Sequence, residues 1–261
     1  MLLHFFKYHG TGNDFIMIDN RDEHFPKKNV ALVAFLCDRH FGIGADGLIL
    51  LETDPEVDFS MVYYNSDGRP GSMCGNGGRC LVAFAKQLGM IDESTVFRAV
   101  DGLHEASLDA RGRVSLKMQD VTEIKQKPNY LYLDTGSPHH VQLVANLADM
   151  DVRAEGAKLR YGLYGRKGCN INFVEAVDKD SYRVRTYERG VEDETLSCGT
   201  GVTAVALAMH QMNRTQSNKI ALHAVGGELQ VCFNENSKGY NNVYLIGPAE
   251  MVFKGEIEWK G

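Results

Sequence analysis

Hydrophobic residues in this chain fall mostly into short alternating runs, and two segments depart from that pattern. Residues 57–64 and 182–187 alternate between apolar and polar positions, which is typical of half-buried strands. Residues 81–85 and 202–209 are instead apolar at nearly every position. A helix that is hydrophobic on every face is buried on every face. We therefore expect, in each half, a curved and mostly antiparallel sheet wrapped around one central helix. Gly89 and Asn213 are the expected stop signals of the two helices.

The same order of elements occurs twice along the chain. Each half contains, in this order, an apolar segment, a glycine-containing turn, a short strand, an alternating strand and a Cys-Gly motif. In the first half these elements lie at 30–36, 39–44, 48–51, 57–64 and 74–77. In the second half they lie at 141–147, 165–168, 171–174, 182–187 and 198–201. Order that is shared over five elements indicates an internal repeat.

A polar segment that contains Pro128 separates the two halves, and the linker is expected near residues 117–128. We predict an α/β (α+β) protein of two similar domains, 1–118 and 119–249. The C-terminal residues alternate like an edge strand, so 250–261 is expected to complete the sheet of the first domain.

Composition narrows the class of protein. The 261 residues are 44% hydrophobic and 24% charged, as in ordinary globular proteins. A net charge of −6 gives no reason to expect a nucleic-acid-binding surface. No apolar run approaches the ~20 residues that span a bilayer, and residues 1–7 look like a first strand rather than a signal peptide. We expect a cytoplasmic protein with neither nucleic acid nor membrane as a partner.

Two of the six cysteines differ from the others. Cys37, Cys169 and Cys232 lie in apolar runs, and Cys80 faces away from Cys74 on the same helix, so these four are expected in the core. The sequence contains no Cys-x₂-Cys or His-x₃₋₅-His pair with the usual spacing of a zinc site, so no metal is expected. Without a secretory signal, reduced thiols are more common than disulfides.

Cys74 and Cys198 each begin a glycine-rich helix start. A thiol there lies beside unpaired N–H groups and the positive end of the helix dipole, which lowers its pKa from about 8.5. The same N–H groups can bind a carboxylate. Two such elements would hold one carboxylate from both sides, with a thiol on each face of the adjacent carbon. That arrangement favours chemistry that needs an acid and a base.

Other polar residues have two interpretations. Asparagines at turns and strand ends can bond to the backbone or bind a ligand: Asn13, Asn65 and Asn170. His139 could tune a thiol or end a strand. Glu188 and Arg189 could form an exposed ion pair of little energetic value, or recognise the two ends of an amino acid.

Taken together, these motifs resemble the diaminopimelate epimerase family. The matching segments run in order along essentially the whole chain, at 9–15, 39–47, 64–68, 74–80, 136–139, 187–190 and 195–201. Cys-Gly-x-Gly alone is shared with proline racemase-like enzymes, whereas the Gly-Asn-Asp-Phe opening and the Glu-Arg-Gly segment are more specific.

The resemblance implies two α/β domains with the active site in the cleft between them. It implies cofactor-free, two-base epimerisation of LL- to meso-diaminopimelate, in lysine and peptidoglycan-precursor biosynthesis, by a homodimer. Cys74 and Cys198 would be the acid–base pair, and His139 and Glu188 would help to set their pKa values. The implied substrate-binding residues are Asn13, Asn65, Gly75, Asn76, Asn170, Glu188, Arg189, Gly199 and Thr200.

The chain departs from the family pattern at two positions. Gly47 stands where some relatives carry a glutamine ligand, so no side-chain contact can be assigned there. Ser137 stands where many carry asparagine, and it can still form one hydrogen bond with the substrate.

The expected mechanism has one cysteine removing the α-proton as a thiolate, while the other delivers a proton to the opposite face as a thiol. Two alternatives remain. The first is a racemase or epimerase of proline or hydroxyproline, against which the charged pair Glu188 and Arg189 argues, because proline has no second amino-acid centre. The second is a non-catalytic dimeric module with redox-sensing or structural Cys-Gly motifs.

Overall fold

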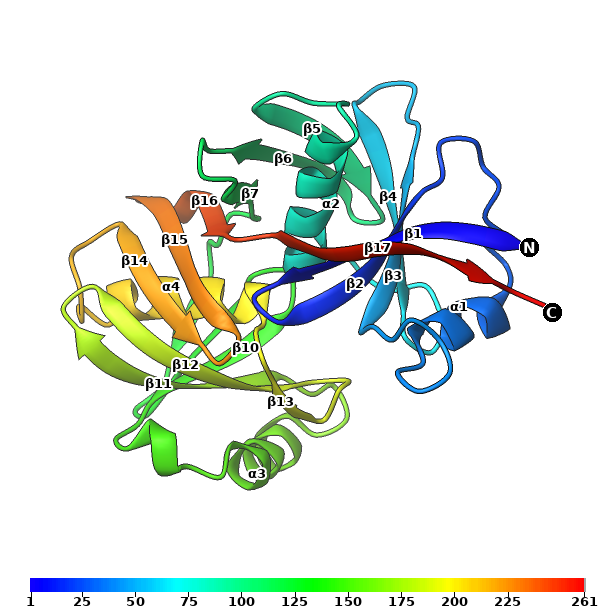
Figure 1. Ribbon diagram of the computed structural model, residues 1–261. Helices are drawn as coiled ribbons and strands as arrows, with labels where there is room; N and C mark the ends of the chain where they lie inside the picture. The colour runs from blue at the N-terminus through cyan, green and yellow to red at the C-terminus, as the bar shows by residue number, and fades with distance from the viewer. Residues whose placement is uncertain (261) are drawn as a thin grey trace. The chain divides into compact units, whose positions relative to one another are not determined.

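The computed structural model describes residues 1–260. The chain divides into two compact units, each built of strands and helices (Figure 1). The first unit comprises Met1–Leu116 together with the C-terminal segment that begins at Pro248, and the second comprises Lys117–Gly247.

The first unit is a mixed sheet around the helix α2 (Gly75–Gln87). Across the sheet the strands are β17 (Glu250–Glu258), β1 (Leu2–Gly10), β2 (Asn13–Asp19), β3 (Gly47–Glu52), β4 (Phe59–Asn65), β5 (Ser94–Ala99), β6 (Gly102–Leu108) and β7 (Val114–Lys117). α2 packs against β1, β2, β3 and β6. Since these strands are spread across the sheet, the sheet curves around the helix. A shorter helix, α1 (Val30–Cys37), packs against β3.

The second unit is built in the same way around the helix α4 (Gly199–Gln211). Its strands across the sheet are β8 (Ile124–Gln126), β9 (Leu131–Asp134), β10 (Pro138–Leu143), β11 (Asn170–Asp178), β12 (Ser181–Glu188), β14 (Lys219–Ala224), β15 (Gly227–Asn236) and β16 (Gly239–Gly247). The short β13 (Asp193–Thr195) also pairs with β12. The 3₁₀ helix η1 (Leu147–Asp149) and the helix α3 (Val152–Tyr164) lie between β10 and β11.

Strand pairing confirms the predicted two similar domains. From β17 to β7, only β2–β3 and β4–β5 are parallel. From β8 to β16, only β10–β11 and β12–β14 are parallel. These two pairs occupy the same places in the strand order of their sheet as the two parallel pairs of the first unit. The register of the first parallel pair also agrees between the units. Phe15 pairs with Gly47 between β2 and β3, and His139 pairs with Asn170 at the equivalent place between β10 and β11. Residues at equivalent positions of the two units can therefore be compared directly.

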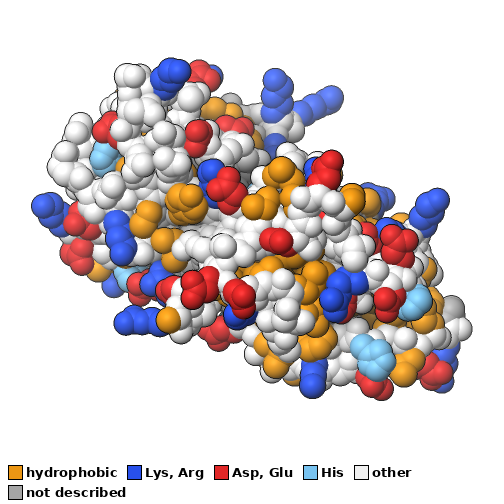
Figure 2. Space-filling view, turned by 90° about the horizontal axis from the view of Figure 1, so that it is seen from above, with side chains coloured by type: hydrophobic (Ala, Val, Ile, Leu, Met, Phe, Trp, Pro, Cys, Tyr) orange, Lys and Arg blue, Asp and Glu red, His pale blue; other side chains and the backbone are white. Residues whose placement is uncertain are grey.

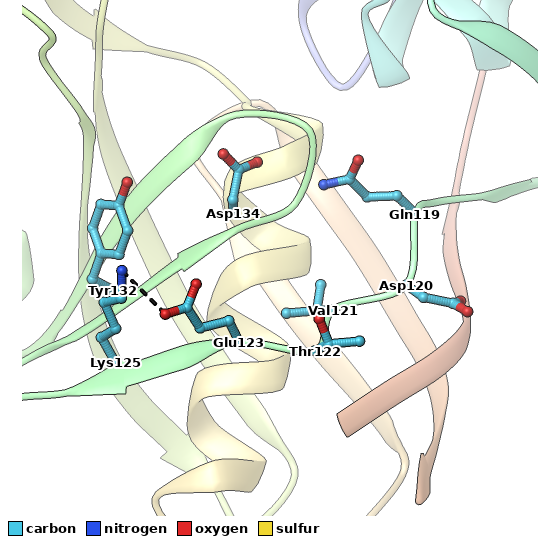
Figure 3. Close-up of a pocket in the computed structure, with 8 residues that line it drawn as sticks. All are labelled: Gln119, Asp120, Val121, Thr122, Glu123, Lys125, Tyr132 and Asp134. Carbon is cyan, nitrogen blue, oxygen red and sulfur yellow. Dashed lines mark ion pairs between the residues drawn. The ribbon is translucent and has the colours of Figure 1, made fainter. Parts of the chain in front are cut away.

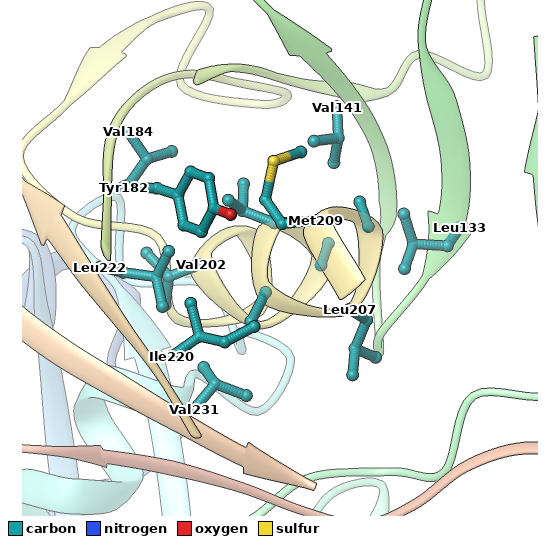
Figure 4. Packing of buried hydrophobic residues seen from close by; sticks show 14 of the residues in the cluster. Leu133, Val141, Tyr182, Val184, Val202, Leu207, Met209, Ile220, Leu222 and Val231 are labelled. Carbon is teal, nitrogen blue, oxygen red and sulfur yellow. The ribbon is translucent and has the colours of Figure 1, made fainter. Parts of the chain in front are cut away.

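The central helices are buried on every side, as their composition predicts. In α4, the side chains of residues 204–209 are fully buried. Figure 4 shows Leu207 and Met209 surrounded by Leu133, Val141 and Ile220 from the enclosing strands. Burying a side chain of this size stabilises the fold by roughly 1.5–3 kcal/mol. This packing holds the first turn of the helix in place.

Both helices end where the sequence predicts. α2 is followed by Gly89 at φ +71°, and α4 by Asn213 at φ +54°. These are left-handed backbone conformations, which glycine and asparagine adopt most readily.

One core prediction is wrong. Cys37, Cys80 and Cys169 are buried, but Cys232 is only partly buried. Burial alternates along β15, and Cys232 lies on the face of this strand opposite to the buried Val231 and Phe233. The apolar run predicted too much burial for Cys232, because one face of this strand is exposed.

Charges of both signs are interspersed on the face of the molecule drawn in Figure 2, with apolar side chains between them. Among residues 1–260, no helix is long and apolar enough to cross a membrane.

Candidate active site

In the first unit, Cys74 is the N-cap residue of α2. Its backbone is extended, at φ −114° and ψ 122°, and no side chain caps the helix. The first turn therefore directs its N–H groups out of the helix end, beside the thiol. The thiol Sγ lies 3.6 Å from Oδ1 of Asn13, which also accepts a hydrogen bond of 3.2 Å from Nδ2 of Asn76. Three predicted site residues are thus brought together with Gly75 at one helix start.

An ion cluster fixes the side chain of Asn13. Its Nδ2 donates to Asp46 at 2.7 Å, and Asp46 pairs with Arg39. Arg39 and Lys7 both pair with Asp14. Burial by itself would raise the pKa of the Asp14 carboxyl, but hydrogen bonds from Arg39 and Lys7 outweigh it and hold this pKa well below its usual range. The cluster therefore keeps the Asn13 amide oxygen directed at the thiol.

In the second unit, Cys198 occupies the equivalent position at the start of α4. It is the N-cap residue, at φ −119° and ψ 111°, and again no side chain caps the helix. Its Sγ lies 3.5 Å from Oγ1 of Thr200, which lies 2.9 Å from Nε2 of His139. Nδ2 of Asn172 lies 3.1 Å from Nδ1 of His139. Because an amide N–H₂ can only donate, Nδ1 is the acceptor and we assign the proton to Nε2.

His139 is held in its neutral form. Burial, with a smaller contribution from the Arg189 cation, lowers its pKa to about 3. The imidazole can therefore donate a hydrogen bond to Thr200 but carries no charge at neutral pH. Sequence analysis missed the buried Asn172 that fixes this ring, although its place two residues after Asn170 puts it on the same face of β11.

Three further predicted residues meet at the ends of the neighbouring strands. Nδ2 of Asn170 donates to Oγ of Ser137 at 3.0 Å, and the backbone N–H of Arg189 donates to Oδ1 of Asn170 at 2.8 Å. Glu188 accepts a hydrogen bond of 3.0 Å from Oγ1 of Thr195. In the first unit, Asn65 is exposed at the end of β4.

Comparisons with known proteins agree with this geometry. The model of the family described as "Diaminopimelate epimerase" matches residues 5–124 and 131–252. The chain belongs to this family. The diaminopimelate epimerase of Flavobacterium psychrophilum is 58% identical over 97% of this chain and 99% of its own length. That of Chlorobaculum tepidum is 43% identical over 95% of this chain and 98% of its own length.

Solved structures with little sequence similarity share the fold. A PhzF-family phenazine biosynthesis protein from Bacillus anthracis has a TM-score of 0.80 at 13% identity, covering 99% of this chain and all of that one. A hydroxyproline epimerase from Agrobacterium vitis has a TM-score of 0.70 at 13% identity, covering 98% and 92%. At such low identity these likenesses concern the fold alone.

The structure leaves no room for a side chain at position 47. A Cβ built on Gly47 would lie 2.5 Å from a ring carbon of Tyr63 and 2.6 Å from the backbone oxygen of Tyr64. A Cβ on Gly71 would lie 2.4 Å from the other side of the same ring. The ring of Tyr63 therefore occupies the space that a side chain at position 47 would fill.

Replacing Gly47 by alanine is accordingly expected to destabilise the protein by about 1–3 kcal/mol, the usual cost of overpacking. The matched control is Gly162→Ala in α3, where an added Cβ would meet nothing within 4 Å. That change should be neutral or stabilising by up to ~1 kcal/mol, because alanine favours helix. Urea unfolding measures both changes. A Gly47→Ala protein as stable as the parent would contradict this packing.

Stability in acid should reveal the neutral His139. Its pKa is about 3 in the folded protein against about 6.5 for a free histidine, so the unfolded chain binds more protons between these values. The resulting stability is complete above pH 6.5 and is lost as the pH falls towards 3, at ~1.4 kcal/mol per pH unit. His140, whose pKa burial lowers to about 4, adds a similar loss.

In the His139→Phe variant, the free energy of unfolding should fall less steeply with decreasing pH than in the parent protein. The difference in slope should correspond to about one proton bound on unfolding. Phenylalanine is chosen because Phe15 occupies the equivalent position in the first unit. The variant also lacks two hydrogen bonds, so the slope of unfolding free energy against pH, from urea titrations between pH 4.5 and 7.5, is the quantity to compare. An unchanged slope would show that His139 is not the group that titrates.

A separate polar cavity of about 340 Å³ lies in the second unit (Figure 3). It contains three carboxylates, of which Glu123 pairs with Lys125 at 3.1 Å. The residues that line it include none of the predicted site residues.

Proposed function

We propose that this chain epimerises LL-diaminopimelate to meso-diaminopimelate with two cysteine bases. The observation that carries the proposal is the equivalent placing of Cys74 and Cys198, each as the uncapped N-cap residue of the central helix in one of two similar units. Membership of the diaminopimelate epimerase family supports the substrate. The reaction serves lysine and peptidoglycan-precursor biosynthesis, and we propose a cytoplasmic homodimer on the grounds of family membership.

In this mechanism one cysteine, as thiolate, removes the α-proton, and the other, as thiol, protonates the opposite face. The α-proton is a weak acid, so negative charge that develops on the α-carboxylate must be stabilised. N–H groups in the first turns of α2 and α4 supply this stabilisation, through Gly75 and Asn76 and through Gly199 and Thr200. The two thiols exchange protonation states in each turnover, so their titrations are coupled. No step requires a cofactor.

The remaining polar residues would bind the rest of the substrate. Asn13 and Asn65 belong to the first unit, and Ser137, Asn170, Glu188 and Arg189 to the second. The carboxylate of Glu188 and the guanidinium of Arg189 suit a second amino-acid centre, with its ammonium and carboxylate groups. Proline has no such centre. Within the second unit, His139 would act on Cys198 through Thr200, and Glu188 would oppose formation of a nearby thiolate.

Deuterium incorporation tests the proposal directly. LL-diaminopimelate incubated with the protein in deuterated water should gain one α-deuterium, and the labelled centre should be inverted. Proline and hydroxyproline serve as comparison substrates and should gain no label. Absence of exchange into diaminopimelate, or faster exchange into either proline substrate, would overturn the proposed substrate.

A further inference from the structure

The hydroxyl group of Thr200 lies between the neutral His139 and the thiol of Cys198. Its Oγ1 lies 2.9 Å from Nε2 of His139 and 3.5 Å from Sγ of Cys198. Within residues 1–260, these two atoms are the only hydrogen-bond partners of Oγ1. A hydroxyl group has a single hydrogen to donate, so the direction of the first bond decides what the second bond can be.

Asn172 settles the direction of the bond between His139 and Thr200. Its amide is fully buried and fixed in one orientation, because Nδ2 donates to the backbone oxygen of His140 at 2.9 Å and Oδ1 accepts from Oγ1 of Thr186 at 3.0 Å. The second hydrogen on Nδ2 is therefore donated to Nδ1 of His139, at 3.1 Å. With Nδ1 as an acceptor, the neutral ring carries its proton on Nε2 and donates it to Thr200.

This direction leaves the hydrogen of the Thr200 hydroxyl group for the sulfur. Since Oγ1 accepts from Nε2, its own hydrogen is free to bond the other partner, Sγ of Cys198. A thiolate accepts such a hydrogen strongly, whereas the sulfur of a neutral thiol is a weak acceptor. A hydrogen bond to the charged form of an acid favours that form. The arrangement therefore favours the thiolate of Cys198.

Other side chains stand at the equivalent positions of the first unit. Phe15 has the place of His139 in the strand register, and Asn76 has the place of Thr200, two residues after the cysteine. A phenyl ring has no N–H or O–H group to donate. The chain of hydrogen bonds from imidazole to hydroxyl group to sulfur is therefore a feature of the second unit.

The sulfur of Cys74 faces an acceptor instead. Arg79, which is fully buried, donates to Oδ1 of Asn76 at 3.0 Å and so orients this amide. Nδ2 of Asn76 then donates to Oδ1 of Asn13, the oxygen that lies 3.6 Å from Sγ of Cys74. An amide oxygen can bond the S–H form but not the thiolate. The side-chain oxygens that face the two sulfurs thus favour opposite protonation states.

Charged groups at this end of the second unit act on a thiolate in both directions. Glu188 at the end of β12 and the adjacent Arg189 differ in sign, and Asp134 at the end of β9 is exposed. His139 and His140 are uncharged at neutral pH, because burial lowers their pKa values to about 3 and about 4. The threonine hydroxyl group differs from all of these because it contacts the sulfur itself.

We propose that the hydroxyl group of Thr200 stabilises the thiolate of Cys198, and that Asn172 is the positioning residue that directs this hydroxyl group through His139. As a statement about catalysis this rests on the proposed function, in which Cys198 must be a thiolate for one direction of the reaction. As a statement about ionisation it concerns the chain alone.

Alkylation of Cys198 measures the role of the hydroxyl group. Iodoacetamide reacts with thiolates, and mass spectrometry of peptides gives the midpoint of the reaction across pH 5–10. Every sample carries Cys74→Ala, because the titrations of two interacting thiols are otherwise coupled. In this background, Thr200→Val should raise the midpoint for Cys198 by about one pH unit, which corresponds to about tenfold slower alkylation at pH 7.

Two further variants separate the hydroxyl group from packing. Thr200→Ser keeps a hydroxyl group and should slow alkylation by less than about threefold. Thr203→Val makes the matched change in the same helix, where the hydroxyl group donates to the backbone oxygen of Gly199 at 2.9 Å. It should leave the midpoint unchanged. Equal slowing in Thr200→Val and Thr200→Ser, or none in Thr200→Val, would reject the role of the hydroxyl group.

Asn172→Leu tests the positioning role. Without a donor at Nδ1, the ring of His139 can carry its proton there and accept the Thr200 hydrogen on Nε2, away from the sulfur. The midpoint for Cys198 should therefore rise, by less than in Thr200→Val. When Thr200→Val is already present, Asn172→Leu should leave the midpoint unchanged. An equal rise in both backgrounds, or no rise in either, would show that Asn172 does not act through this hydroxyl group.

The protonation of His139 in the parent protein keeps the proposal testable if Asn172→Leu does not fold. NMR spectra with isotope-labelled histidine rings, assigned by the signal that is lost in His139→Phe, should show the proton on Nε2. A proton on Nδ1 would overturn the inference.

The two proposals can fail separately. If no α-deuterium enters diaminopimelate while Thr200→Val still raises the midpoint for Cys198, the proposed function fails and the inference about ionisation stands. If deuterium enters with inversion but Thr200→Val leaves the midpoint unchanged, the proposed function stands and the inference fails.

Discussion

Replacing either Cys74 or Cys198 by alanine should abolish inversion of diaminopimelate, with a fall in kcat of at least about 10³-fold. A positioned acid or base typically contributes 10²–10⁴-fold, and neither helix start offers a second group to do the work of its sulfur. Each variant retains one thiol, so it can at most remove a proton and return a deuteron to the same face. The variant that keeps the sulfur on the face of the α-hydrogen should give labelled substrate of unchanged configuration, and the other variant should give unlabelled substrate.

Chiral chromatography and mass spectrometry of the same samples measure inversion and labelling together. Cys232→Ala is the matched control, because that thiol is partly exposed on β15 and outside the proposed site. Its kcat should stay within about twofold of the parent value, as surface changes are usually mild. Inversion at a normal rate by Cys74→Ala or Cys198→Ala would reject the two-thiol mechanism.

Much of the fold could be predicted because its strongest determinant is local. Residues that are apolar on all sides of a helix, such as 202–209, can only be satisfied by complete enclosure, and α4 is enclosed. The partners of each strand could not be predicted in the same way. Whether β4 pairs with β5 in parallel depends on the path of the chain around α2, which no short segment encodes.

In the candidate site, too, features set by neighbouring residues could be predicted and features set by packing could not. The Cys-Gly motifs indicated both thiols, because a helix start is defined by neighbouring residues. Arg79 had no distinguishing signal, since an arginine near a helix start is usually exposed, and only packing shows that it is fully buried. At Gly47 the sequence indicated a missing contact, but not that the ring of Tyr63 fills the space. The roles of the substrate-binding residues remain predictions.

Gly201→Ala should impair catalysis strongly. A Cβ there would lie 2.6 Å from Oδ1 of Asn172 and 3.3 Å from Sγ of Cys198. Asn172 cannot easily move, because its Nδ2 donates to the backbone oxygen of His140 and its Oδ1 accepts from Thr186. The first turn of α4 must therefore shift, and Cys198 with it. Displacement of a catalytic group by about 1 Å can cost about 10²-fold in rate.

The duplicated fold provides the control for this change. Gly77 occupies the equivalent position on α2, where a Cβ would lie 2.8 Å from Cδ1 of Ile49 and 3.3 Å from Cε of Met61. Both atoms end flexible side chains that can move aside, so Gly77→Ala should cost about 1–3 kcal/mol of stability but less than about tenfold in kcat/KM. Epimerisation kinetics and urea unfolding of the two variants decide the comparison. A loss of less than about tenfold in Gly201→Ala would mean that the sulfur of Cys198 tolerates displacement, and that its position is less critical than a two-base mechanism requires.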